Sequence, residues 1–155
     1  MADKRYNQFI QHQMRNEQPD KEKLISIASL IRREFGLTVQ REAIFTFDKN
    51  DGHLVNFSCW LTEEQFKNHI IHVPDLIFFV KGRLVILEID GYIHYVKHSV
   101  VIKDEVRDEC YNKAKLHWYK IDELVVLLQL GKKPDRSATV QELWPEIKKI
   151  IKKII

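Results

Sequence analysis

Residues 74–91 hold two apolar runs separated only by Lys81-Gly82-Arg83, and this stretch constrains the fold more than any other. The runs, Asp75–Val80 and Leu84–Asp90, are rich in Ile, Val, Leu and Phe, which is typical of strands that are buried on both faces. Gly82-Arg83 suits a two-residue loop, because a type II′ turn prefers Gly at its first central position. We therefore predict an antiparallel hairpin inside a sheet.

This hairpin would bring carboxylates together at its open end. The predicted loop pairs Ile77 with Glu88 and Asp75 with Asp90, and paired residues share a face of the sheet. Acids placed so closely repel one another and are costly to keep in an apolar sheet, unless a divalent cation binds between them. The pattern predicts a metal site, and the alternative is that these acids end their strands and point into water.

Length and composition fit one soluble domain. The chain has 155 residues, enough to bury a core, and its net charge of +3 is compatible with a nucleic-acid partner without requiring one. Cys59 and Cys110 have neither metal-ligand spacing nor the density of a disulfide scaffold, so we expect reduced thiols and a cytoplasmic protein. The chain begins without an apolar signal region and has no run of about 18 apolar residues, so no membrane partner is expected.

The remaining chain predicts an α/β sandwich with a mixed central sheet flanked by helices. Residues 1–19 are expected to be an N-terminal arm and residues 20–155 a single domain. The other expected elements are helices at Lys21–Phe35, from Thr62 to about Ile71, at Lys103–Leu116 and at Glu123–Leu130, and strands at Leu37–Phe47, His53–Trp60 and His117–Ile121.

Two weaker metal signals occur before the hairpin. His69 and His72 would share a face of the helix that begins at Thr62, but no paired ligands accompany them, so surface histidines are the preferred interpretation. The turn from Asp48 to Gly52 resembles a calcium loop only faintly, because its Gly falls one position early and no Glu closes it. We predict no calcium site there.

The C-terminal segment, about residues 139–155, predicts a basic amphipathic helix. Four isoleucines, Ile147, Ile150, Ile151 and Ile154, form one stripe, and four lysines lie opposite it: Lys148, Lys149, Lys152 and Lys153. Three interpretations stay open. The helix packs on the core with a solvated basic face, it contacts nucleic-acid phosphates, or it lies on a membrane surface.

The order of these motifs resembles a known nuclease superfamily. An acid after Pro74 that opens one core strand, and Glu88-Ile89-Asp90 closing the next, resemble the PD-(D/E)XK nucleases. Glu88-x-Asp90-Gly91-x-x-His94, followed by Asp104-x-x-Arg107, resembles the branch of very-short-patch repair endonucleases. Glu22-x-Leu24 and Gln40-Arg41 also match that branch, and the likeness spans about residues 20–122.

The resemblance implies a restriction-endonuclease-like fold and Mg²⁺-dependent endonucleolytic hydrolysis of DNA, with Mn²⁺ as a substitute ion. Asp75, Glu88 and the Ile89 carbonyl would hold the ion, which would lower the pKa of an attacking water. His94 would orient that water, transfer protons or bind a phosphate oxygen, and Asp90 would be a second ligand or would fix the His94 tautomer. Glu22 is a further candidate, although an ordinary helix-dipole partner explains it as simply.

The sequence offers several positively charged residues for the site. Lys97 and Arg107 are candidates for neutralising charge in the transition state, but Arg107 fits a helix ion pair with Asp104 or Asp108 equally well. The usual superfamily lysine would fall at position 90, which here is Asp90, and this leaves its role open among Lys97, Lys113, Lys120 and Gln40. A catalytically silent nucleic-acid-binding or assembly module is therefore the alternative function, and a homodimer stays open.

Overall fold

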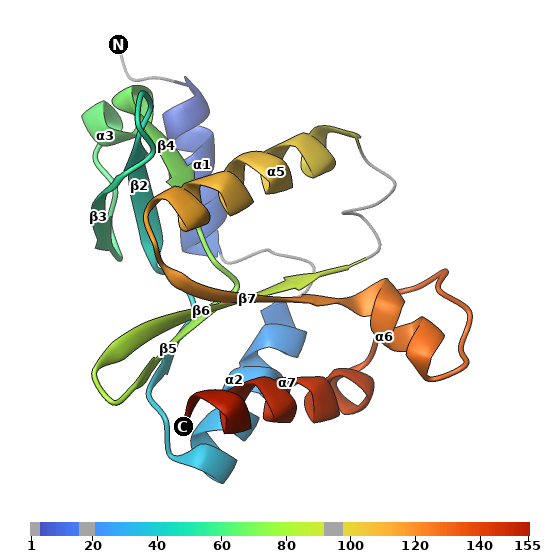
Figure 1. Cartoon of the computed structure of the whole chain (residues 1–155). Coiled ribbons are helices and arrows are strands. Elements are labelled where there is room, and N and C mark those ends of the chain that lie inside the picture. Colours follow the sequence, from blue (N-terminus) through green and yellow to red (C-terminus); the bar gives the residue numbers. More distant parts are fainter. Residues whose placement is uncertain (1–3, 16–20, 92–97) are drawn as a thin grey trace.

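The computed structural model describes residues 4–15, 21–91 and 98–155. Figure 1 shows the elements along the chain. They are α1 (Lys4–Arg15), α2 (Lys21–Phe35), β1 (Val39–Gln40), β2 (Ile44–Asp48), β3 (Leu54–Ser58), α3 (Glu63–Asn68), β4 (His69–His72), β5 (Leu76–Val80), β6 (Arg83–Asp90), α5 (His98–Lys113), β7 (His117–Asp122), α6 (Glu123–Gln129) and α7 (Val140–Ile154). None of the described helices is long and apolar enough to cross a membrane.

A mixed four-stranded sheet forms the centre of the molecule and confirms the predicted α/β class. Its strand order is β1-β5-β6-β7, with antiparallel pairs except for the parallel pair of β6 and β7. A second, antiparallel sheet has the order β3-β2-β4 and stands beside the first (Figure 1). The predicted hairpin strands β5 and β6 are the two inner strands of the central sheet, so the acids at their ends lie in the interior.

The hairpin turn begins one residue earlier than predicted, and this shifts the pairing register by two residues. The loop is Lys81-Gly82, with φ values of 52° and 76°, and Val80 pairs with Arg83. Positive φ at both central residues is the type I′ pattern, whose twist matches the flanking strands. The predicted register was therefore wrong by two, yet a shift by two residues leaves every side chain on its predicted face, whereas a shift by one would invert them all.

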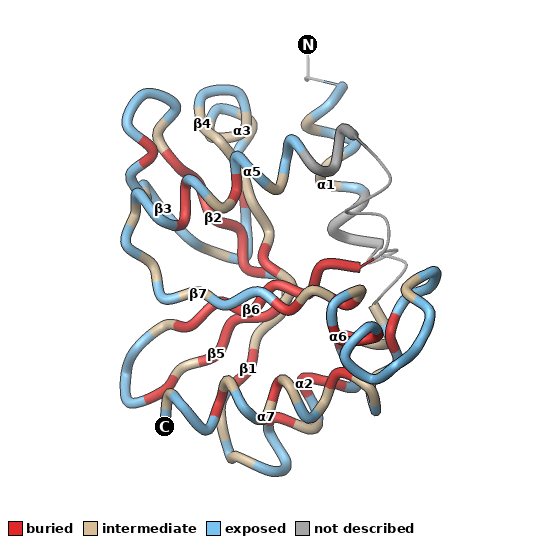
Figure 2. The backbone as a smooth tube through the Cα atoms, turned by 45° about the vertical axis from the view of Figure 1, so that its right-hand side comes forward, coloured by how far each residue is buried: buried red, intermediate tan, exposed pale blue. Residues whose placement is uncertain are grey.

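Helices cover both faces of the central sheet, and each face has its own hydrophobic core. On one face α2 and α7 pack against the strands, and the fully buried residues include Ile27, Ile147 and Ile151. On the other face Cys110 and Tyr111 of α5 pack over the sheet and against β2. Figure 2 shows the buried strands running between these helical layers. The predicted isoleucine stripe of the C-terminal helix is thus confirmed as a core contact.

Two of the sequence predictions fail between Phe35 and Pro74. The predicted strand Leu37–Phe47 is split into β1 and β2, which belong to different sheets. The capping box at Thr62 is present, but its helix ends at Asn68, and His69–His72 forms the strand β4 instead. Pairing with β2 overrides the weak helical pattern there, because β-branched residues such as Ile70 and Ile71 fit a strand better.

The predicted N-terminal arm contains the helix α1, which contacts the smaller sheet layer. The Tyr6 hydroxyl donates a hydrogen bond to the Leu61 carbonyl at 2.6 Å, and the rings of Tyr6 and Phe9 lie against the ring of Phe66. These contacts place α1 next to α3.

Candidate active site

The acids predicted from the hairpin lie together at its open end. Glu88 and Asp90 alternate with Ile89 on β6, so both side chains point to the face that α5 covers, and each residue is only 3% exposed. Asp75 comes one position before the pair of Leu76 with Leu87, opposite Glu88 in the register. Its Oδ2 accepts a hydrogen bond from the Ile89 backbone N–H at 2.7 Å. The hairpin therefore collects three carboxylates beside α5.

Arg107 of α5 is the positive charge closest to these acids in the described chain. It is 6% exposed, and its Nη1 lies 3.4 Å from Glu88 Oε2 and 3.2 Å from Asp90 Oδ1, while its Nη2 lies 3.2 Å from Asp90 Oδ2. The predicted helix ion pairs also form, with Asp104 at 3.3 Å and Asp108 at 2.8 Å. The Arg107 guanidinium thus offsets part of the negative charge that the sequence analysis expected a metal ion to offset.

Arg107 lies closer to Asp108 than to Glu88 and Asp90. Hydrogen bonds between guanidinium and carboxylate are usually about 2.7–2.9 Å long. Arg107 reaches that range only with Asp108, through Nε at 2.9 Å and Nη2 at 2.8 Å. Its contacts with Glu88 and Asp90 are longer. The shortest contacts of Arg107 are therefore those with Asp108 of its own helix.

Tyr111, one helical turn after Arg107, completes the surroundings of Glu88. Its hydroxyl donates a hydrogen bond to Glu88 Oε1 at 2.9 Å, and burial, followed by the charge of Glu88, raises the pKa of Tyr111. The Tyr111 hydroxyl therefore stays protonated and remains a donor. The Tyr111 ring is fully buried, so its hydroxyl holds one oxygen of Glu88 from the side that faces the hydrophobic core.

Glu88 carries a perturbed pKa. Burial, and then the neighbouring charge of Asp75, raise the pKa of Glu88 well above its usual range, although Arg107 and the Tyr111 hydrogen bond act in the opposite direction. Glu88 therefore keeps its proton to higher pH than an ordinary glutamic acid does. A strongly shifted carboxyl beside a specific charge partner is typical of functional sites.

Lys120 is the lysine that the central sheet places next to the acids. It pairs with Glu88 in the parallel register of β6 and β7, so the two side chains share a face of the sheet. Its Nζ lies 3.2 Å from Asp108 Oδ2, which links it to Arg107. Of the other described candidates for the missing lysine, Lys113 pairs with Glu109 and Gln40 donates to the Cys59 sulfur. Lys120 therefore has the best position among these three.

The other predicted site residues have different surroundings or lie outside the described part of the chain. Glu22 is exposed in the first turn of α2, while the neighbouring Lys23 forms an ion pair with the buried Glu123. His94 and Lys97 lie outside the described residues. The four lysines of α7 belong to the helical layer on the face of the sheet opposite to α5, and Lys149 pairs with Glu146 at 3.1 Å. These lysines are separated from the acids by the sheet.

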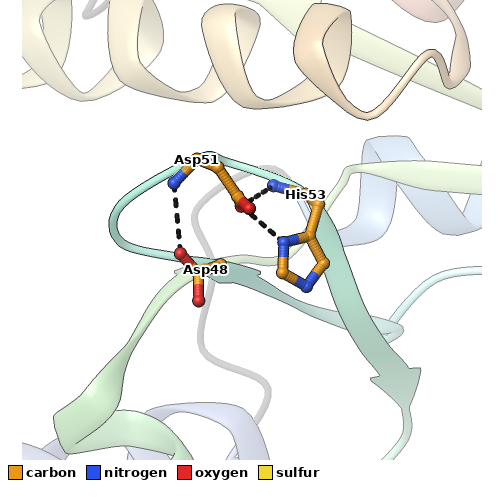
Figure 3. Close-up of side chains that lie close together, drawn as sticks. All are labelled: Asp48, Asp51 and His53. Atoms are coloured by element: carbon orange, nitrogen blue, oxygen red, sulfur yellow. Dashed lines mark hydrogen bonds and ion pairs between the residues drawn. The ribbon is translucent and has the colours of Figure 1, made fainter.

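A second acidic group lies in the turn that joins β2 to β3. Figure 3 shows Asp48, Asp51 and His53 close together, and their ligand atoms lie within 4.8 Å of one another. The acids already accept hydrogen bonds from the turn: Asp48 Oδ1 from the N–H groups of Asn50 and Asp51, and Asp51 Oδ1 from the N–H of His53. This geometry is that of Asx turns, which form without an ion.

Sequence reasoning missed Tyr111, and it placed His72 on a helix surface, whereas His72 lies on β4 against the Tyr111 ring. The apolar residues of the predicted helix Lys103–Leu116 suggest an inner face that includes Val106, but Val106 is 38% exposed, whereas Arg107 and Tyr111 are buried. The spacing of four residues between Arg107 and Tyr111 was the available signal, because such residues share one helix face.

Searches of protein-family models, curated proteins and solved structures give no match to this chain.

His72 gives the structure a predicted response to acid. Burial, and then the charge of Arg107, lower the pKa of His72 to about 4. The unfolded chain would bind this proton at about pH 6.5, so stability is lost as pH falls from 6.5 through 4. We expect His72→Phe to remove a pH-dependent loss of about 2–3 kcal/mol between pH 7.5 and 4.5, as measured by urea unfolding at both values.

The raised pKa of Glu88 acts in the opposite direction, since its folded-state proton is lost as pH rises, but this contribution is common to both proteins and cancels in the comparison. His117→Phe, at an exposed position on β7, is the matched control and should leave the pH dependence unchanged. An equal acid response in wild type and His72→Phe would contradict a buried, neutral His72.

Proposed function

We propose that this protein is a metal-dependent DNA endonuclease, with Mg²⁺ as the ion and Mn²⁺ as a substitute. The observation that carries the proposal is Glu88, a buried carboxyl with a raised pKa at the point where Asp75 and Asp90 also converge. The order of motifs that resembles the PD-(D/E)XK nucleases, including His94, supports the same function from the sequence.

The donor set fits a hard divalent cation. Four acids contact the Arg107 guanidinium, and they are Glu88, Asp90, Asp104 and Asp108. Lys120 contacts Asp108, and Asp75 lies beside Glu88, so acids outnumber positive charges among these described residues. Mg²⁺ takes oxygen ligands and is commonly held by one or two carboxylates together with substrate phosphates. Asp75, Glu88 and the Ile89 carbonyl would supply those oxygens.

The bound ion would polarise the scissile phosphate and lower the pKa of an attacking water. Arg107, held on Asp108, would stabilise the negative charge that develops on the phosphate oxygens, with Lys120 beside it. Tyr111 would keep Glu88 in one orientation. His94, four residues after Asp90, is the proposed group for orienting the water or transferring its proton.

A catalytically silent nucleic-acid-binding module is the second candidate, and Arg107 is the observation that favours it. The guanidinium already contacts Glu88 and Asp90, as it would in a site that uses an internal charge in place of a metal ion. The two functions differ in whether the acids take up a divalent cation.

The test is a cleavage assay on duplex, mismatched, branched and single-stranded DNA, with Mg²⁺, with Mn²⁺ and with EDTA. The nuclease proposal predicts cleavage of at least one DNA form that requires the ion. Binding to DNA without cleavage of any form would favour the silent module.

We also propose that the lysine face of α7 attracts DNA without taking part in the chemistry. Because the sheet separates α7 from the acids, replacing all four lysines by Gln should flatten the salt dependence of DNA affinity, by roughly one unit of slope for each lost phosphate contact. The cleavage rate at saturating DNA should be unchanged. Fluorescence anisotropy over a salt series measures the slope for the variant of Lys148, Lys149, Lys152 and Lys153.

The control removes the same charge from exposed positions on other elements, Lys49, Lys67, Lys113 and Lys133. An equal salt slope in wild type and the α7 variant would return α7 to a purely structural role.

A further inference from the structure

A buried ion pair lies beside the end of β6 and has no part in the proposed chemistry. Glu123, the first residue of α6, is 1% exposed, and its Oε1 accepts a hydrogen bond from the Nζ of Lys23, near the start of α2. The same ammonium donates a hydrogen bond to the Ala138 carbonyl at 2.8 Å. Lys23 therefore joins the starts of α2 and α6 to the segment that precedes α7.

The other carboxylate oxygen of Glu123 packs against Gly91, the residue that follows Asp90. A Cβ added at Gly91 would clash with Glu123 Oε2. Gly91 is buried, and its φ lies outside the left-handed region, so this position needs glycine for the close approach of the carboxylate. Because Lys23 holds the opposite oxygen, the carboxylate cannot turn away from Gly91 without disturbing the ion pair.

The end of β6 is thus held from both faces of the central sheet. Asp90 pairs with Asp122 in the parallel register of β6 and β7, and Gly91 and Glu123 are the residues that follow this pair. On one face, the Asp90 side chain contacts Arg107 of α5. On the other face, which α2 and α7 cover, the Glu123 carboxylate lies against Gly91.

Stability alone gives a weak reason for this ion pair. Desolvation offsets much of the attraction between two buried charges, and apolar residues of similar volume often stabilise a fold as well or better. Buried polar groups that are fully hydrogen-bonded, in contrast, hold their neighbours in a single arrangement. The contact of the pair with the residue that follows Asp90 therefore indicates a role in placing the end of β6.

We propose that Glu123, held by Lys23, is a positioning residue for the candidate active site. Its carboxylate fixes Gly91 and thereby the preceding backbone of β6, which carries two of the acids and the Ile89 carbonyl. Groups that orient metal ligands from outside the coordination sphere typically change metal affinity or activity by roughly 10–100-fold. The consequence for cleavage rests on the proposed function, whereas the placement of the end of β6 does not.

The experiment follows the side-chain carboxyl carbons of Asp90 and Asp104 by ¹³C NMR in EDTA. Both carboxylates contact Arg107, but only Asp90 belongs to β6. The variant replaces Lys23 and Glu123 together by Met, which removes the ion pair but keeps the side-chain volume, so the protein should still fold. We expect the Asp90 signal to shift and the Asp104 signal to stay in place.

Gly91→Ala disturbs the same contact from the strand and should also shift the Asp90 signal, because the new Cβ displaces the Glu123 carboxylate. In DNA cleavage with Mg²⁺, both variants should lower the rate at saturating DNA about tenfold and leave the KM for DNA unchanged. The control replaces the exposed ion pair of Lys67 and Glu63 on α3 by Met and should change neither measurement.

An unshifted Asp90 signal in both variants would overturn the inference, and so would equal shifts at Asp90 and Asp104, which would indicate general loosening. A shift at Asp90 with cleavage at the wild-type rate would overturn it as well, because the acids would then not need the ion pair. A wild type that cuts no DNA would defeat the nuclease proposal alone, and the Asp90 signal would still decide whether Glu123 places the end of β6.

Discussion

Replacing Glu88 by Gln is expected to reduce metal-dependent DNA cleavage by several orders of magnitude while leaving the fold intact. Because burial and Asp75 raise the pKa of Glu88, the site favours the neutral form of this side chain more than water does, and Gln closely matches that neutral form. Gln also keeps an oxygen for the Tyr111 hydroxyl. It cannot supply the charged ligand that a divalent cation requires. Cleavage rates at equal folded concentration, with urea unfolding in EDTA, measure both effects.

Asp75→Asn extends this prediction to the second ligand. The amide oxygen still accepts the Ile89 N–H, so this variant should also fold and lose cleavage. Glu105→Gln, at an exposed position on α5, is the matched control and should cut DNA at the wild-type rate. Wild-type cleavage by Glu88→Gln would remove Glu88 from the chemistry.

Arg107→Met is expected to lower the free energy of unfolding more than any of the other proposed substitutions. The guanidinium is 6% exposed and contacts Glu88, Asp90, Asp104 and Asp108, so its removal leaves buried carboxylates without their main positive partner. Breaking a buried ion pair from one side typically costs about 3–5 kcal/mol. Urea unfolding of wild type and variant at pH 7.5 in EDTA measures the difference.

A second substitution separates the charge effect from lost packing. Adding Glu88→Gln to Arg107→Met removes one unpaired acid, so the double variant should recover part of the lost stability. Arg33→Met, at an exposed position on α2, is the control and should change the free energy of unfolding by less than about 0.5 kcal/mol. A loss of similar size for Arg107→Met and the control would mean that the acids do not depend on Arg107.

The sequence predicted correctly that the acids share one face of the sheet. A register shift by an even number of residues leaves every side chain on its face, so this prediction did not need the exact register. The predicted register was wrong by two residues, but side chains alternate with period two, so Asp75 and Glu88 stayed on one face. The hairpin, α2, β7 and the α7 stripe were also predictable, because each has a strong apolar pattern or a cap.

The partners of the acids were not predictable in the same way. Arg107 could be interpreted as a surface ion pair, since nothing local shows that α5 turns this side chain toward the sheet. His72 was assigned to a helix, because the sheet that places it beside Tyr111 is formed by pairing with β2, which is distant in the chain. Local periodicity carries no information about such tertiary contacts.

The most direct test of the proposed metal site is a calorimetric titration of Mn²⁺ into wild type and Glu88→Gln in the absence of DNA. Wild type should bind the ion with an affinity that increases with pH, because the proton held by Glu88 must leave before its carboxylate can coordinate. Glu88→Gln should show no binding of this kind. Equal Mn²⁺ affinity in the two proteins, or no binding to wild type at any pH at which it is folded, would contradict a divalent cation held by Asp75 and Glu88.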